Sequence, residues 1–165
     1  MRTACLIITL SEWAEAHRDL LQHQMDKLSP AVQRLMLMGA AMPAAEYIHA
    51  QRIRQRYIAA YEEAFSRVDL LADTTMAMVP YDQSAESVTV DGITESPLFM
   101  ALRHTMPQNM TGQPAISVPC GFGAESLPVS LMLTARRYED AFVLSAANEY
   151  QQLTNWHLNR PCLTA

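Results

Sequence analysis

The stretch TGQPAISVPCGF at residues 111–122 opens the strand-rich half of the sequence. It predicts one strand over 115–119, and a second strand is predicted over 129–134. The loop between the two strands carries Gly121 and Gly123. In the second strand two sets of residues alternate from one position to the next, which is the period of a strand whose two faces differ. One face would carry Val129, Leu131 and Leu133, and the other Ser130, Met132 and Thr134.

Helices are predicted for most of the first half. The most regular pattern covers 44–67, where apolar residues recur every three or four positions, the period of a buried helical stripe. Ser29 and Pro30 form a cap and first helical position for a shorter helix that reaches about Met38. Gly39 is expected to end or interrupt that helix.

The first 27 residues allow two interpretations. The continuous apolar run ACLIITL at 4–10 is typical of a strand covered on both faces. Ser11 would then cap a helix that runs to about Lys27. The alternative is a signal peptide cleaved after the A-x-A pattern at 14–16, but acidic residues crowd that region and the apolar run is short. We favour the buried strand.

The remaining segments complete the prediction of the fold class. A short strand is predicted at 68–72, a long variable connection at 73–97 with weak β character near its end, and a helical turn at 98–104. A final helix starts at 139, and the tail from 156 shows no clear element. The sequence therefore predicts an α/β chain, with α+β as the alternative, in a single domain over 1–165.

The composition excludes several classes of protein. The chain has 165 residues, of which 50% are hydrophobic, and a formal net charge of -5. Such a chain is neither disordered nor collagenous, and it offers polyanions no general attraction, so we expect no nucleic-acid partner. No apolar run approaches the roughly 20 residues of a membrane helix, so we expect no membrane association. Three widely spaced cysteines, Cys5, Cys120 and Cys162, fit the reducing cytoplasm.

Most motifs that bind cofactors or catalyse reactions are absent from the sequence. It contains no G-x-G-x-x-G, no G-x-x-x-x-G-K-[ST] and no G-x-S-x-G. The five histidines never stand four residues apart, the spacing that would place two imidazoles on one helix face. We therefore expect no metal and no cofactor.

Two charged clusters and one cysteine have ordinary structural explanations. The three arginines fit a solvated helix face better than a phosphate site. The two adjacent glutamates point in different directions, so they make a poor acid–base pair. The cysteine fits a small buried side chain at a strand end better than a reactive thiol. These residues are Arg52, Arg54 and Arg56, Glu62 and Glu63, and Cys120.

The segment at 109–122 resembles the C-terminal portion of the amidase signature family, which often reads N-x-T-G-x-P-A-x-S-V-P-x-G-F. The likeness continues in LPV at 127–129, in RRYEDA at 136–141 and in the ending W-H-x-x-R-P at 156–161. Upstream segments from 11 onward also fit in order, so the resemblance spans nearly the whole chain. Six motif positions are expected to have structural roles: Asn109, Thr111, Gly112, Pro114, Pro119 and Gly121.

The resemblance implies hydrolysis of carboxylic amides, or ammonia transfer from them, by a Ser–Ser–Lys triad with a Gly/Ser-rich oxyanion loop. Those parts lie in family regions ahead of anything matched here. Lys27 is the only lysine, in a segment that does not match the catalytic lysine, and no glycine adjoins a serine. We therefore expect no catalytic residue in this chain. The resemblance does not indicate which residues would bind substrate.

The matched region also departs from the family pattern. Asp73 to Met76 replaces the usual T-P-T, Ser130 replaces a glycine, and Gln108 replaces a phenylalanine. Leu102 stands where the A subunits of the transfer-RNA amidotransferases commonly have Asp, which weakens the case for glutamine as substrate.

Two hypotheses follow. The first is that the chain is a C-terminal segment of an amidase and forms part of a larger mixed sheet flanked by helices. Such a segment would lack activity without the missing N-terminal portion. In that case a small-molecule amide would bind only to the complete enzyme. The second is a binding or assembly module that keeps the amidase C-terminal layer and forms a homo-oligomer through unpaired strand edges and apolar faces. A reading frame upstream of Met1 that encodes a lysine and a G-G-S-S-G-G loop would favour the first.

Overall fold

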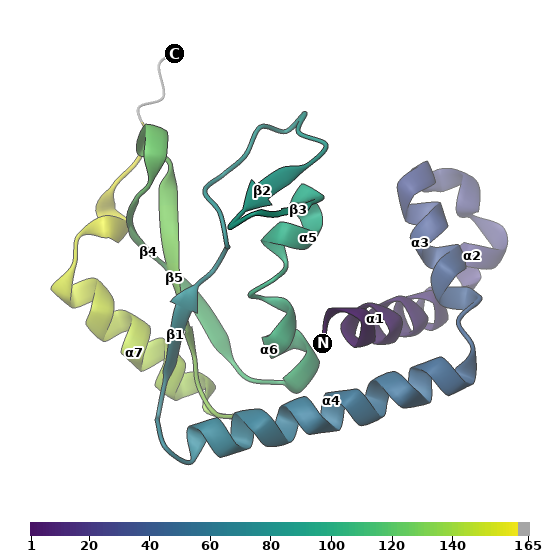
Figure 1. Cartoon of the computed structure of the whole chain (residues 1–165), viewed down its shortest axis with the longest axis horizontal. Coiled ribbons are helices and arrows are strands. Elements are labelled where there is room, and N and C mark those ends of the chain that lie inside the picture. The colour runs from purple at the N-terminus through teal and green to yellow at the C-terminus, as the bar shows by residue number, and fades with distance from the viewer. Residues whose placement is uncertain (162–165) are drawn as a thin grey trace. The chain divides into compact units, whose positions relative to one another are not determined.

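The computed structural model describes residues 1–161 and divides the chain into two compact units, Met1–Tyr61 and a second that starts at Glu62. Helices form the first unit, and the second contains all strands of the described chain (Figure 1). No helix within residues 1–161 combines the length and apolar character needed to cross a bilayer. The single-domain expectation stays a prediction, since two compact units can belong to one domain.

The first unit is a set of helices joined by short turns. They are α1 (Arg2–Ala16), α2 (Arg18–His23), the 3-10 turn η1 (Met25–Lys27), α3 (Pro30–Ala40) and the first part of α4 (Ala44–Phe65). The main packing contact is that of α1 with α3. Ser29 caps α3 as predicted, its hydroxyl accepting from the Val32 amide at 3.4 Å. The predicted long helix at 44–67 is confirmed as α4.

The predicted strand at 4–10 is wrong, because these residues lie inside α1. Ala4, Cys5 and Ile8 are buried, a spacing of three and four residues that matches one helical face. Ser11 lies within the same helix and caps nothing. The predicted helix to Lys27 is instead divided into α1, α2 and η1, with the first break at His17.

Helix α1 packs closely against α3 at Gly39. Gly39 is buried inside α3, and a Cβ added there would lie 2.0 Å from the backbone oxygen of Leu10. Gly39 therefore does not end the helix, which continues to Ala40. Its missing side chain lets the two backbones touch, a long-range contact that the composition of 4–10 does not reveal.

The second unit is built on a three-stranded antiparallel sheet in the order β1-β5-β4, with β1 (Leu71–Thr74), β4 (Ala115–Phe122) and β5 (Pro128–Thr134). Leu133 of β5 is paired with Ile116 on one side and Ala72 on the other. The two predicted strands at 115–119 and 129–134 are confirmed, whereas the strand predicted at 68–72 starts and ends later.

The other elements surround this sheet. The connection at 73–97 contains the two-stranded sheet of β2 (Val88–Val90) and β3 (Ile93–Glu95), where weak β character was predicted. The rest are short helices and turns, together with the predicted final helix α7: α5 (Pro97–Ala101), α6 (Met106–Thr111), η2 (Ala124–Ser126), α7 (Asp140–Leu153) and η3 (Trp156–Leu158). The helical turn predicted at 98–104 corresponds to α5. The tail predicted to be irregular contains η3, and its last residues, 162–165 with Cys162, lie outside the described residues.

The core of the second unit lies between the sheet and α7 (Figure 1). Val118 of β4 and Leu133 of β5 pack against Val143 and Ala147 of α7. Each of the larger side chains contributes roughly 1.5–3 kcal/mol by leaving water. Because side chains alternate along a strand, Met132 and Thr134 point to the opposite face, the side on which α5 and α6 lie. The helix-and-sheet class is thus confirmed.

Gly39→Ala tests the contact between α1 and α3 through the sign of its effect. Helix propensity alone would stabilise the protein by about 1 kcal/mol. The clash with Leu10 instead predicts a loss of roughly 1–3 kcal/mol in the free energy of unfolding, measured by urea denaturation. Ala31→Gly, at an exposed position of the same helix, is the control and should cost no more than about 1 kcal/mol. Stabilisation by Gly39→Ala would contradict the close approach.

Candidate functional site

The turn between α6 and β4 contains two motif residues, Thr111 and Gly112, followed by Gln113, and holds a buried hydroxyl. Thr111 is fully buried, and its side chain donates to the backbone oxygen of Pro107 at 2.6 Å and to the amide oxygen of Gln113. Gly112 follows with φ +81°, a left-handed conformation that favours glycine, and its amide donates to Gln108 at 2.7 Å. The T-G-Q sequence thus ends the helix and directs the chain into the sheet.

The other motif positions shape β4. The carbonyl of Pro114 accepts from the Ala135 amide at 3.1 Å, and Pro119 is paired with Ser130. The register shifts by one residue between Pro119 and Gly121, which leaves Cys120 as the extra residue of a bulge, and Gly121 follows it with φ +145°. Asn109 is exposed on α6. The structure brings five of the six motif residues into one continuous turn and strand, but it assigns none of them a chemical step.

A polar cluster lies where β1 ends. His104 Nδ1 lies 2.9 Å from the backbone oxygen of Thr74 and 3.6 Å from the carboxylate of Asp73. Thr75 reaches the hydroxyl of Ser117 on β4 at 2.7 Å. A hydrogen bond from Nδ1 to the carbonyl would leave Nε2 as an acceptor in the neutral ring. This arrangement can orient a polar group. No sequence motif predicted it, because its members are about 30 to 40 residues apart, and the only local signal was the departure from T-P-T at Asp73 to Met76.

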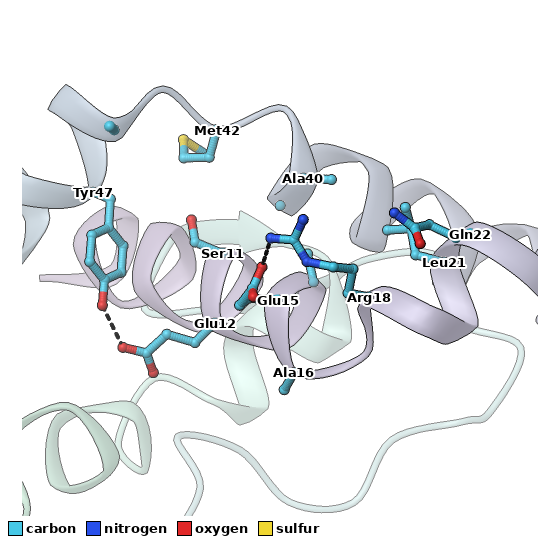
Figure 2. A pocket seen from close by; sticks show the side chains of 13 residues that line it. Ser11, Glu12, Glu15, Ala16, Arg18, Leu21, Gln22, Ala40, Met42 and Tyr47 are labelled. Atoms are coloured by element: carbon cyan, nitrogen blue, oxygen red, sulfur yellow. Dashed lines mark hydrogen bonds and ion pairs between the residues drawn. The ribbon is translucent and has the colours of Figure 1, made fainter.

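A large hollow within the first unit lies beside α1 and has a volume of about 630 Å³ (Figure 2). Small residues leave this space open, among them Ala14, Gly39 and Ala40. At its rim the Tyr47 hydroxyl donates to Glu12 at 2.8 Å, and this hydrogen bond raises the pKa of the Tyr47 phenol. Arg18 forms an ion pair with Glu15. The hollow therefore combines an apolar floor with charges that are mostly paired.

The remaining sequence candidates lie apart from these sites. Lys27 is on η1, where its Nζ donates to Gln24 at 3.0 Å. Arg52 and Arg56 are exposed on α4 as expected for a solvated face, and Cys120 is half-buried in β4. Over the described range 1–161, no group of three His, Cys, Asp or Glu side chains is placed to hold a metal ion.

Thr111→Val tests the buried hydroxyl of the turn. Valine keeps the volume but leaves the Pro107 oxygen and the Gln113 amide without their donor, so the free energy of unfolding should fall by roughly 1–3 kcal/mol in urea denaturation. Thr111→Ser keeps the donor and should recover part of that loss. A Thr111→Val protein as stable as the wild type would show that the buried Thr111 hydroxyl does not stabilise the turn.

Comparison with known proteins identifies relatives for almost the whole chain. The family model described as Amidase matches residues 4–144. The A subunit of the glutamyl-tRNA(Gln) amidotransferase of Chloroflexus aurantiacus is 38% identical over 141 residues, which cover 81% of this chain and 27% of that protein. The corresponding protein of Aromatoleum aromaticum is 30% identical over 163 residues, covering 92% of this chain and 32% of its own length.

Solved structures agree on the fold. A protein of a vestigial complex, studied for the evolutionary origins of an s-triazine catabolic enzyme, has a TM-score of 0.85 at 25% identity over 96% of this chain and 35% of its own. An amidase has a TM-score of 0.84 at 21% identity, over 91% of this chain and 34% of its own. The chain thus spans about a third or less of the proteins it matches. By its sequence and its fold, the chain belongs to the amidase family.

Proposed function

We propose that this chain is the C-terminal segment of an amidase-like hydrolase of carboxylic amides and that it does not catalyse hydrolysis alone. The family match over residues 4–144 carries the proposal, together with the short span of the relatives that it covers. A small-molecule amide would bind only in the complete enzyme, where this segment helps to shape the pocket.

The position of Lys27 supports the lack of activity. The amidase chemistry that the resemblance implies needs a lysine beside two serines, as the base that activates the nucleophile. Lys27, the only lysine, is exposed and donates to Gln24 on the same short turn. The Lys27 amine thus has a glutamine, and not a pair of serines, as its hydrogen-bond partner.

The substrate of the complete enzyme is proposed only as a carboxylic amide. The relatives in Chloroflexus and Aromatoleum are named as A subunits of glutamyl-tRNA(Gln) amidotransferase. Leu102 is half-buried and stands at the position where the family resemblance implies Asp in such A subunits. We therefore place other amides ahead of glutamine.

Ammonia release from the isolated chain tests the proposal. Incubation with acetamide, benzamide and glutamine should give the same ammonia as buffer, and addition of the N-terminal portion of a complete amidase of this family should raise it. Turnover by the pure chain that Ser117→Ala or Ser130→Ala abolishes would contradict the proposal. Turnover that a substitution of any other residue of the chain abolishes, including a Cys or Thr nucleophile, would contradict it equally.

A second candidate function is self-assembly, because the second unit exposes apolar surface. Large side chains of α7 and η3 remain in contact with solvent, including Leu153 at 85% and Leu158 at 62% exposure. Phe122 and Trp156 meet edge to face beside them, both partly exposed. Within residues 1–161, β4 has a strand on one side only, so its outer edge is open to pairing.

Light scattering across micromolar concentrations tests this second function. A homo-oligomer is expected, and Leu153→Gln together with Leu158→Gln should lower its mass if these faces meet. A monomer at all concentrations would contradict self-assembly and leave the amidase segment as the function. We also propose a cytoplasmic location, with Cys5 and Cys120 as the free thiols that the structure describes.

A further inference from the structure

We propose that the second unit binds a zwitterionic α-amino acid in the hollow between Glu62 and Arg137, with the carboxylate on Arg137 and the ammonium group on Glu62. The hollow has a volume of about 390 Å³ and lies beside the motif turn, lined also by Phe65, Gln113 and Tyr138. This binding requires no amide hydrolysis, so it goes beyond the proposed function.

Two adjacent arginines differ in their partners. Arg136 is fully engaged: it donates to the backbone oxygen of Phe65 at 2.6 Å and to the Asp69 carboxylate at 3.0 Å, with Glu139 at 3.8 Å. Arg137 has no carboxylate within ion-pair distance in the described part of the chain. Its one side-chain hydrogen bond is a long one, 3.4 Å, to the Tyr138 hydroxyl. The positive charge of Arg137 is therefore available to a ligand.

The Arg137 side chain is nevertheless held in place. Its Nε is buried without an acceptor, close to Gly112, where an added Cβ would lie 3.4 Å from Nε. The guanidinium lies over the Tyr138 ring, 5.3 Å from its centre. Tyr138 adopts φ +69°, a strained conformation for a bulky residue. A fixed guanidinium loses less conformational entropy when a carboxylate binds, which favours affinity.

Glu62 supplies the opposite charge at the same hollow. The neighbouring Glu63 pairs with Arg67 at 2.7 Å, whereas the Glu62 carboxylate has no partner among residues 1–161. Arg137 and Glu62 both line the hollow without reaching each other. A ligand with one negative and one positive group satisfies both charges, which neither a simple acid nor a simple amine does.

The size and lining of the hollow fit a small amino acid. Its volume lies in the range of ligand pockets, about 300–1,000 Å³. Phe65 and Tyr138 give apolar surface for a side chain. The Gln113 amide oxygen accepts from Thr111, which orients the Gln113 side chain within the same turn.

Calorimetric titration of the full chain tests the site with three probes of one carbon skeleton. L-leucine carries both charges, isocaproate only the carboxylate, and isoamylamine only the ammonium group. We expect saturable binding of leucine, with each single-charge analogue at least about tenfold weaker. Arg137→Gln and Glu62→Gln should each weaken leucine binding by about tenfold or more.

Glu63→Gln is the matched control, since it removes an adjacent carboxylate that is paired outside the hollow. It should leave leucine binding unchanged, and circular dichroism should show that all three variants remain folded. The proposal is overturned if leucine shows no saturable binding, if isocaproate binds as tightly as leucine, or if Arg137→Gln binds leucine like the wild type. These outcomes are independent of ammonia release, so this proposal can fail while the proposed function stands.

Discussion

The second unit depends on the pairing of β5 with strands on both of its sides. Leu71, Ala115 and Thr134 meet only because β5 pairs with β1 on one side and β4 on the other. The apolar face of β5 supports α7, and its other face turns toward α5 and α6. Since a strand presents alternate residues to opposite faces, a slip of one position would reverse both environments at once.

The motif turn acts on the same sheet from the N-terminal end of β4. Thr111 and Gly112 end α6 and aim the chain so that Ile116 meets Leu133 in register. Ser117 then faces the side on which Thr75 and His104 gather at the end of β1. The role of this motif is therefore geometric. It positions β4 so that the polar side chain of Ser117 reaches the polar groups at the end of β1. The same turn places Gly112 against Arg137, which joins the motif to the hollow in which we propose amino-acid binding.

Local patterns predicted the elements whose folding is decided locally. The strand at 129–134 and the helix from 44 follow from their own periodicity, and Ser29 caps the next helix through a bond three residues away. The strand predicted at 4–10 was wrong because a short continuous apolar run fits a buried strand and a buried helix equally well. The contact of this segment with Gly39, about thirty residues away, is not visible in any local pattern. The contact between His104 and Thr74 was not predicted either, because a loop and a strand end thirty residues apart in the sequence form it. The amidase resemblance supplied the family, but not the hollow beside Arg137, because Glu62 and Phe65 on its lining lie far from the quoted motifs in the sequence.

The central proposal is that this member of the amidase family forms one segment of the fold and lacks an activated nucleophile. Labelling with a fluorophosphonate, which bonds covalently to activated serines, tests it most directly. Intact-mass spectrometry of the pure chain should show the unmodified mass, because Lys27, the one lysine of the sequence, has no hydrogen bond to a serine within residues 1–161. Stoichiometric modification of one serine, located by peptide mapping, would contradict the claim.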